Sequence, residues 1–358
     1  MRNRRKQEES KGEEKGRCER KRRAVERKAE EIGKAAWRAL REEVVTTPKP
    51  GLVDGISNGA HQDMDLSLFL ESADVLRPFF VQMALAGLRE SGTPEQLFLR
   101  VRQIGKEAER DMLKATGGIN THKGAIFTMG LLCAAAGRTL QERYRLTPEN
   151  ILETERQMAG DTLERELAAL QRKRPESHGE EVLCRYRSDG IRGEALRGYP
   201  SLRTLVLPVF CETEQETICA EEAGAVRQRQ EKTEERDDWN LRKLCALMHL
   251  MSRVEDSNIL YRKGPQILEE VHREAEQYLR WGGPFQDVSC QKLKELDRRY
   301  SSRGISAGGC ADLLAAGIFL YLLCQSPERC GGMERRWRRF YSGDRLLRKE
   351  SRERSQVS

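Results

Sequence analysis

A short polar stretch between Lys114 and Ile126, KATGGINTHKGAI, combines residue types that bind ligands and move protons. Its adjacent glycines can take positive φ angles or let a ligand approach the backbone, while Asn, Thr, His and Lys supply donors, a proton carrier and a fixed positive charge. Helical patterns flank it, and a polar loop held between rigid elements is a common ligand site. The glycine pair would also fit an ordinary helix C-cap followed by a solvated turn. The apolar run directly after Lys123 favours the ligand site, because it places this lysine at the edge of a buried helix.

A second polar group follows the sequence TTPKPG, whose two prolines end the first packed helix that we predict. The next segment, LVDGISNGAHQDMD, places three carboxylates, an amide and an imidazole within twelve positions: Asp54, Asn58, His61, Asp63 and Asp65. Oxygen ligands of this kind suit Mg²⁺, and the same groups can orient a hydroxyl. For Asp65 alone, a plain N-cap of the next helix is an equal alternative.

Two further segments place acids and bases at junctions. Residues 188–203, SDGIRGEALRGYPSLR, are predicted to form a glycine-rich loop whose arginines, including Arg192, suit phosphate recognition. A solvated loop fits that composition nearly as well. At a second junction, Asp256 and Asn258 precede Arg262 by a few positions.

The turn GISAGG, residues 304–309, opens an apolar helix at Cys310. Free backbone N–H groups at such a helix start would bind an anion beside Ser306 and the glycine pair. Asp312 in the first turn opposes an anion, unless it binds a metal or a sugar hydroxyl.

Hydrophobic periodicity predicts the helices that must position these segments. They cover residues 29–45, 66–88, 94–114, 124–137, 148–173, 239–254, 265–281, 289–300 and 310–324. Glu109 is spaced by three and four from Met112 and Thr116, so it shares the helix face that leads into the Gly-Gly loop. No strand pattern, internal repeat or dinucleotide fingerprint occurs. We therefore predict an all-α fold with one multi-helix globular domain at residues 29–326, between a charged disordered or frayed-helix tail at 1–28 and a basic tail at 327–358.

Composition fits this expectation. Charged residues make up 34% of the 358 residues and aromatic residues only 6%, as in a helix-rich soluble protein. The net charge of +7 lies at the ends, because residues 1–34 carry +6 and residues 334–358 carry +5, which leaves −4 for the body. The ten cysteines show no CxxC pair, no signal peptide is present, and the longest apolar runs are too short to cross a bilayer. We expect a cytoplasmic protein with reduced thiols, no membrane segment and no nucleic-acid partner.

Five segments together resemble one known family: TPKPGLVD with NGAH and DMD, the ATGGINTHKGAIF loop, GIRGEA with GYPSLR, DSNILYRKG, and ISAGGCADLLA. They are similar to the triphosphoribosyl-dephospho-coenzyme A synthases, which serve citrate lyase and have counterparts serving malonate decarboxylase. The resemblance spans roughly residues 36–324. It implies an all-helical enzyme that joins the ribosyl triphosphate of ATP to the 2′-hydroxyl of 3′-dephospho-coenzyme A and releases adenine. The product would then be attached to an acyl-carrier subunit by another transferase, an indirect partner.

Such a reaction needs a base, help for the departing adenine, and cations for the triphosphate. By their chemistry, Glu109 or Asp65 would be the base or oxocarbenium stabiliser, assisted by His61 or His122. The residues expected to contact phosphates or substrate are Lys49, Asn120, Thr121, Lys123, Arg192, Arg262, Ser306, Gly308, Gly309 and Asp312. For Mg²⁺ we expect Asp54, Asp63 and Asp256.

The chain departs from the family pattern at Gly55, where an arginine is expected, and at Ala307 and Cys310, where proline and serine are expected. Loss of the arginine removes one potential phosphate contact. Two alternatives stay open: a helical enzyme that hydrolyses the glycosidic bond of ATP or uses another acceptor, and a basic-armed RNA-binding or scaffolding protein with an inactive core. The sequence is also compatible with an oligomer.

Overall fold

The computed structural model describes residues 2–170, 175, 177–211, 234–286 and 289–324. In this part of the chain there are thirteen α-helices and no strand, which confirms the predicted all-α fold. The helices are α1 (Arg2–Val44), α2 (Leu66–Arg89), α3 (Pro94–Ala115), α4 (Lys123–Gln141), α5 (Pro148–Leu170), α6 (His178–Tyr186), α7 (Gly190–Leu196), α8 (Leu207–Cys211), α9 (Glu234–Met251), α10 (Ser257–Lys263), α11 (Pro265–Arg280), α12 (Ser289–Arg303) and α13 (Gly308–Cys324). A π-helical turn lies at Leu202–Val206 and a 3₁₀ turn at Gly283–Phe285.

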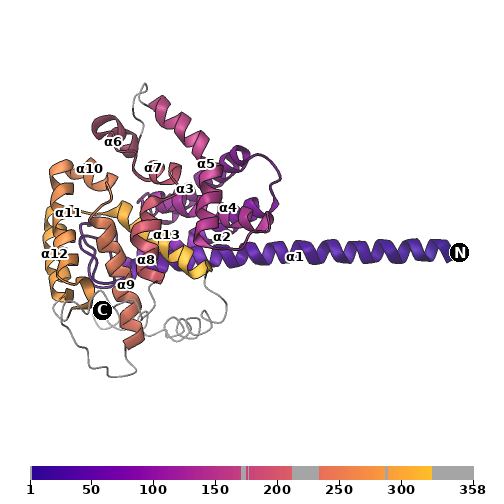
Figure 1. Ribbon diagram of the computed structural model, residues 1–358, viewed down its shortest axis with the longest axis horizontal. Helices are drawn as coiled ribbons and strands as arrows, with labels where there is room; N and C mark the ends of the chain where they lie inside the picture. Colours follow the sequence, from indigo (N-terminus) through magenta and orange to yellow (C-terminus); the bar gives the residue numbers. More distant parts are fainter. Residues whose placement is uncertain (1, 171–174, 176, 212–233, 287–288, 325–358) are drawn as a thin grey trace, which may run out of the picture.

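The first helix has two parts with different surroundings. Its N-terminal part extends away from the other helices, whereas its C-terminal part lies against them (Figure 1). Among its buried apolar residues are Ala29, Ile32, Ala36 and Leu40, which recur with helical spacing. The packed helix predicted from Ala29 is confirmed, and α1 continues back to Arg2 through the predicted charged tail. The other predicted tail, at 327–358, lies outside the described residues.

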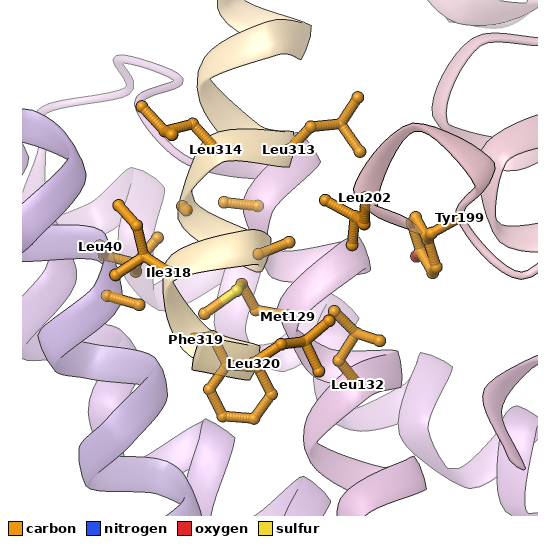
Figure 2. Close-up of a cluster of buried hydrophobic side chains, with 14 of the residues drawn as sticks. Leu40, Met129, Leu132, Tyr199, Leu202, Leu313, Leu314, Ile318, Phe319 and Leu320 are labelled. Atoms are coloured by element: carbon orange, nitrogen blue, oxygen red, sulfur yellow. The ribbon is translucent and has the colours of Figure 1, made fainter. Parts of the chain in front are cut away.

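Helices α4 and α13 lie in the centre of the core. Figure 2 shows α13 between Leu40 of α1 on one side and Leu132 of α4 and Leu202 on the other. Both helices are apolar on nearly every side, as expected for helices enclosed by others. The two longest apolar runs are therefore core helices, as predicted.

A close contact between α2 and α4 depends on glycine. A Cβ atom on Gly87 would lie 2.0 Å from the carbonyl oxygen of Ala134, and one on Gly137 would lie 2.3 Å from that of Ala84. No side chain fits at either position, so the two backbones touch near the C-terminal ends of both helices.

The predicted loop at residues 188–203 is wrong in part. Residues Gly190–Leu196 form α7, in which Gly193 and Ala195 are buried, and contacts between α7 and α5 stabilise this helix despite its glycines. The chain turns only at Gly198 and Tyr199, both with positive φ, before the π-helical turn begins.

None of the helices among the described residues is both long and apolar enough to span a membrane.

Candidate active site

The polar segments singled out in the sequence meet at one end of the core. The loop at residues 45–65 and the N-termini of α4, α10 and α13 contribute to it. Gly124, in the first turn of α4, lies directly against the carboxylate of Asp312 on α13. His61 of the loop lies 3.1 Å from the hydroxyl of Ser306, just before α13. Residues far apart in the sequence therefore form one composite site.

Lys49 is buried under this loop, with only 1% of its surface exposed. Its ammonium group forms an ion pair with the carboxylate of Glu43 and donates to the Glu43 carbonyl oxygen at 2.8 Å. Burial raises the pKa of Glu43, and the charge of Lys49 opposes that rise. Lys49 thus brings a buried positive charge together with its own counter-ion. Sequence reasoning missed Glu43, because it is one of many charged residues on α1.

Asp54 organises the same loop through its carboxylate. One oxygen accepts hydrogen bonds from the backbone N–H groups of Ile56 and Ser57, at 2.7 and 2.9 Å, and the other accepts from that of Lys49 at 2.8 Å. Asp54 is 3% exposed. Its position is that of a loop-forming residue, and its oxygens are already occupied by N–H donors.

The Gly-Gly pair acts as a helix C-cap and also borders the site, the two roles considered for it from the sequence. Gly117 and Gly118 have φ angles of 65° and 93°, and the Gly118 N–H donates to the carbonyl oxygen of Leu113 at 2.7 Å, which closes the end of α3 as a glycine C-cap does. No atom lies within 4 Å of the position of a Cβ on either glycine. The pair therefore caps α3 and also borders open space.

Glu109 reaches the loop, as its spacing on α3 predicts. Its carboxylate lies 2.6 Å from the ammonium nitrogen of Lys123, and both side chains are partly exposed. The Asn120 side chain accepts a hydrogen bond from the Lys123 N–H at 3.1 Å and so satisfies one free donor at the start of α4. An acid and a base are thus held at the accessible rim of the site.

His122 lies beneath this rim and is 3% exposed. Its Nδ1 lies 2.7 Å from the hydroxyl of Ser72 on α2, and the same hydroxyl lies 2.7 Å from that of Thr121. Burial, helped by the nearby Lys49 charge, lowers the pKa of His122 to about 3, so the ring is neutral at physiological pH. Its Nε2 is buried without a hydrogen-bond partner. Sequence reasoning missed Ser72, because an isolated serine within an apolar helix face gives no signal.

Asp256 joins the N-termini of two helices. It caps α10 by accepting from the N–H groups of Asn258 and Ile259, at 2.9 and 3.2 Å. Its other oxygen accepts from the Cys310 N–H of α13 at 2.9 Å. Asp312, two residues further along α13, accepts from the Ala125 N–H of α4. Two carboxylates thus hold three helix starts in place.

His61 and Arg262 lie close together at the other side of the α13 start. Burial lowers the pKa of His61, the positive charge of Arg262 lowers it further, and Asp63 opposes them. His61 is half-buried, whereas Arg262 is exposed. This side of the site offers a neutral imidazole beside a guanidinium group.

Two candidates have other partners. Asp65 caps α2 by accepting from the Leu68 N–H at 2.8 Å, the structural role left open by the sequence. Arg192 lies on α7 and pairs with Glu180 at 3.3 Å. The structure gives neither residue a contact with the loop that carries Lys123.

The three carboxylates expected to bind Mg²⁺ do not form a protein-held metal site. Asp54 and Asp256 each accept three backbone N–H groups, and no group of three or more acidic, His or Cys side chains among the described residues could hold a metal ion. Any Mg²⁺ here would have to bring most of its ligands with it, as a nucleotide complex does.

The assembled site has groups that favour binding of an anion and groups that can transfer protons. Helix N-termini and the exposed Lys123 and Arg262 favour an anion. Carboxyl groups and neutral imidazoles beside them can accept or donate protons at neutral pH. An anionic substrate undergoing proton transfer fits both sets of groups.

Comparison with known proteins agrees with this chemistry. Residues 29–330 match the family model described as ATP:dephospho-CoA triphosphoribosyl transferase. A protein of Klebsiella pneumoniae named 2-(5''-triphosphoribosyl)-3'-dephosphocoenzyme-A synthase is 39% identical over 293 residues, which cover 82% of this chain and 90% of the relative. One of Haemophilus ducreyi with the same name is 34% identical over 311 residues, covering 82% and 89%. A Vibrio cholerae protein named as a probable synthase of this kind is 36% identical over 295 residues, covering 82% and 88%.

No solved structure matches the chain. The family model covers most of the chain, including each segment that builds the site, and the relatives are similar over nearly their whole length. The chain belongs to the ATP:dephospho-CoA triphosphoribosyl transferase family and is a transferase of this kind.

Proposed function

We propose that this site joins the ribosyl triphosphate of ATP to the ribose 2′-hydroxyl of 3′-dephospho-coenzyme A and releases adenine. One observation carries the proposal: the N-termini of α4 and α13 meet beside exposed cations, with proton-transferring groups at the same place. A retained triphosphate needs the cations and helix ends, and cleavage of an N-glycosidic bond needs the acid and base.

Lys123 and Arg262 are the side chains that would contact the phosphates. Both are exposed, Lys123 at the first position of α4 and Arg262 in the last turn of α10. Lys49 would act from below, because its ammonium group is enclosed and bonded to Glu43. Its charge still favours an anion above it.

Glu109 would stabilise the oxocarbenium-like ribosyl group and accept the proton of the incoming hydroxyl. Its carboxylate lies 2.6 Å from the ammonium nitrogen of Lys123, beside the expected phosphates, and a carboxylate is the usual partner of such a transition state. His122 would not act as a base, because the ring is buried and its pKa of about 3 makes it a very weak proton acceptor. It would instead fix the Thr121 hydroxyl through Ser72.

Mg²⁺ would enter as the complex with ATP, held mainly by phosphate oxygens. The product would be the precursor of the citrate lyase prosthetic group, with malonate decarboxylase as the alternative client. A separate transferase would attach it to the acyl-carrier subunit.

The test is incubation of the full chain with ATP, Mg²⁺ and 3′-dephospho-coenzyme A, with adenine and the coupled product measured by mass spectrometry. We expect both products in equal amounts and neither without the acceptor. Adenine release that does not depend on 3′-dephospho-coenzyme A would instead favour a hydrolase. Absence of release, with RNA binding that weakens as salt rises, would favour the basic-armed scaffold.

A further inference from the structure

Three carboxyl groups come close together where α4, α10 and α13 begin. Glu43 ends α1, Asp256 caps α10, and Asp312 lies in the first turns of α13. The negative charges of Glu43 and Asp256 both raise the pKa of Asp312. A negative charge on either neighbour disfavours the ionised form of Asp312.

The three groups differ in what offsets their charge. Glu43 is paired with Lys49, and Lys243 also favours its charged form. Asp256 accepts three backbone N–H groups. Asp312 has the Ala125 N–H as its only stabilising partner among the described residues. Of the three carboxylates, that of Asp312 therefore has the least stabilisation from its partners.

The position of Asp312 also suits contact with a ligand. It is half-buried, whereas Glu43 and Asp256 are 5% and 1% exposed. Its Oδ2 lies over Gly124, where a Cβ would be only 2.0 Å away, so the backbone of α4 at the Lys123 loop leaves room for it. The carboxyl group is thus held beside the loop that would bind the triphosphate.

We propose that Asp312 is the general acid that protonates adenine as it leaves ATP. This inference rests on the proposed function. Burial, together with Glu43 and Asp256, raises the pKa of Asp312 well above its usual value, as a proton donor at neutral pH requires. The sequence suggested a substrate contact at this position and gave no reason for a protonated acid.

The bond between C1′ and the purine nitrogen breaks, its electrons stay with adenine, and the Asp312 proton moves to a ring nitrogen of the base. The 2′-hydroxyl oxygen of 3′-dephospho-coenzyme A forms the new bond to C1′ and gives its proton to Glu109. Glu109 then loses that proton to solvent, and solvent returns one to Asp312.

The test compares Asp312→Asn with the wild type on two donors. Asn has the shape of a protonated Asp and can still accept from the Ala125 N–H, but it cannot donate a proton as an acid. With ATP, we expect kcat to fall about 10²-fold to 10⁴-fold, the usual contribution of a general acid. The second donor is 7-methyladenosine triphosphate, whose positively charged base leaves as a neutral molecule without gaining a proton. After the rate without enzyme is subtracted, we expect the variant to turn over this donor as fast as the wild type.

The outcomes separate the two proposals. Equal losses on both donors would overturn the acid role and leave Asp312 as a structural residue. Wild-type turnover of ATP by Asp312→Asn would do the same, while leaving the transferase function intact. A wild-type chain that releases no adenine from ATP in the presence of acceptor would overturn the function itself, and the acid role with it.

Discussion

Gly124→Ala is expected to damage the site while sparing the fold. The added methyl group would lie 2.0 Å from Asp312 Oδ2 and 3.1 Å from its Cγ, and the third-nearest atom, Asp312 Oδ1, lies at 3.8 Å. An ordinary contact begins at 3.4 Å, so the carboxyl group must withdraw by about 1.4 Å. The same carboxyl group accepts the Ala125 N–H, so its retreat would also disturb that hydrogen bond.

The effects on stability and on turnover differ in size. Alanine in a helix gains up to about 1 kcal/mol over glycine, and overpacking costs about 1–3 kcal/mol. The net loss, at most about 3 kcal/mol, leaves a chain of ordinary stability folded. A catalytic group misplaced by about 1 Å loses roughly 10²-fold in rate. We therefore expect kcat for adenine release to fall about 10²-fold, with an unchanged circular dichroism spectrum.

Gly160→Ala is the matched control. Gly160 lies within α5, and no atom comes within 4 Å of the position of its Cβ. This variant should gain up to about 1 kcal/mol in urea unfolding and keep its full activity. If Gly124→Ala turned over ATP as fast as the wild type, or failed to fold, the added methyl group would not be clashing with the Asp312 carboxyl group alone, and the reasoning would be refuted.

Three further outcomes are expected. Lys123→Ala should lose roughly 10²-fold in turnover and keep its helical circular dichroism, because the lysine is exposed and pairs with Glu109; unfolding of the variant would contradict its assignment to the substrate. The low pKa of His122 means that the folded state opposes its protonation, so its contribution to stability is complete above about pH 6.5 and is lost as pH falls towards about 3. When the pH falls from about 6.5 to about 5, the free energy of unfolding should therefore decrease by about 2 kcal/mol less in His122→Asn than in the wild type. Urea unfolding at both pH values measures this, and an equal decrease in the two proteins would exclude the linkage. Asp54→Ala should cost at least about 2 kcal/mol, because three backbone N–H groups lose their acceptor, and a melting temperature equal to that of the wild type would argue against the loop-forming role.

The sequence predicted the helices well where periodicity or caps mark them. The helix predicted at 94–114 begins at Pro94 as expected, and Thr93 caps it with a reciprocal hydrogen bond to Gln96. The spacing of Glu109 correctly placed it near Lys123, because residues on one helix face share their direction. In contrast, α7 was missed, since its stability comes from contacts with α5 that no local pattern records.

Within the site, the sequence identified segments better than roles. It could not distinguish Asp54, whose oxygens are taken by the loop, from an available ligand, because both are acids in a glycine-rich segment. Ser72 and Glu43 became visible only through their partners from other elements, His122 and Lys49. Roles of this kind depend on distances across the fold, which spacing along the chain does not contain.

The glycine contact between α2 and α4 fixes the positions of the C-terminal ends of these two helices relative to each other. Gly87 lies fifteen residues beyond Ser72, a length of about 22 Å along the helix. A side chain at Gly87 would push the C-terminal ends of the helices apart. Ser72, which meets His122 at 2.7 Å, lies in the same helix on the other side of Pro78. A displacement at Gly87 therefore reaches this hydrogen bond only to the extent that α2 stays rigid through Pro78, which removes one backbone hydrogen bond. A substitution at Gly87 would thus act on this hydrogen bond through the body of α2, and not through a side chain that reaches into the site.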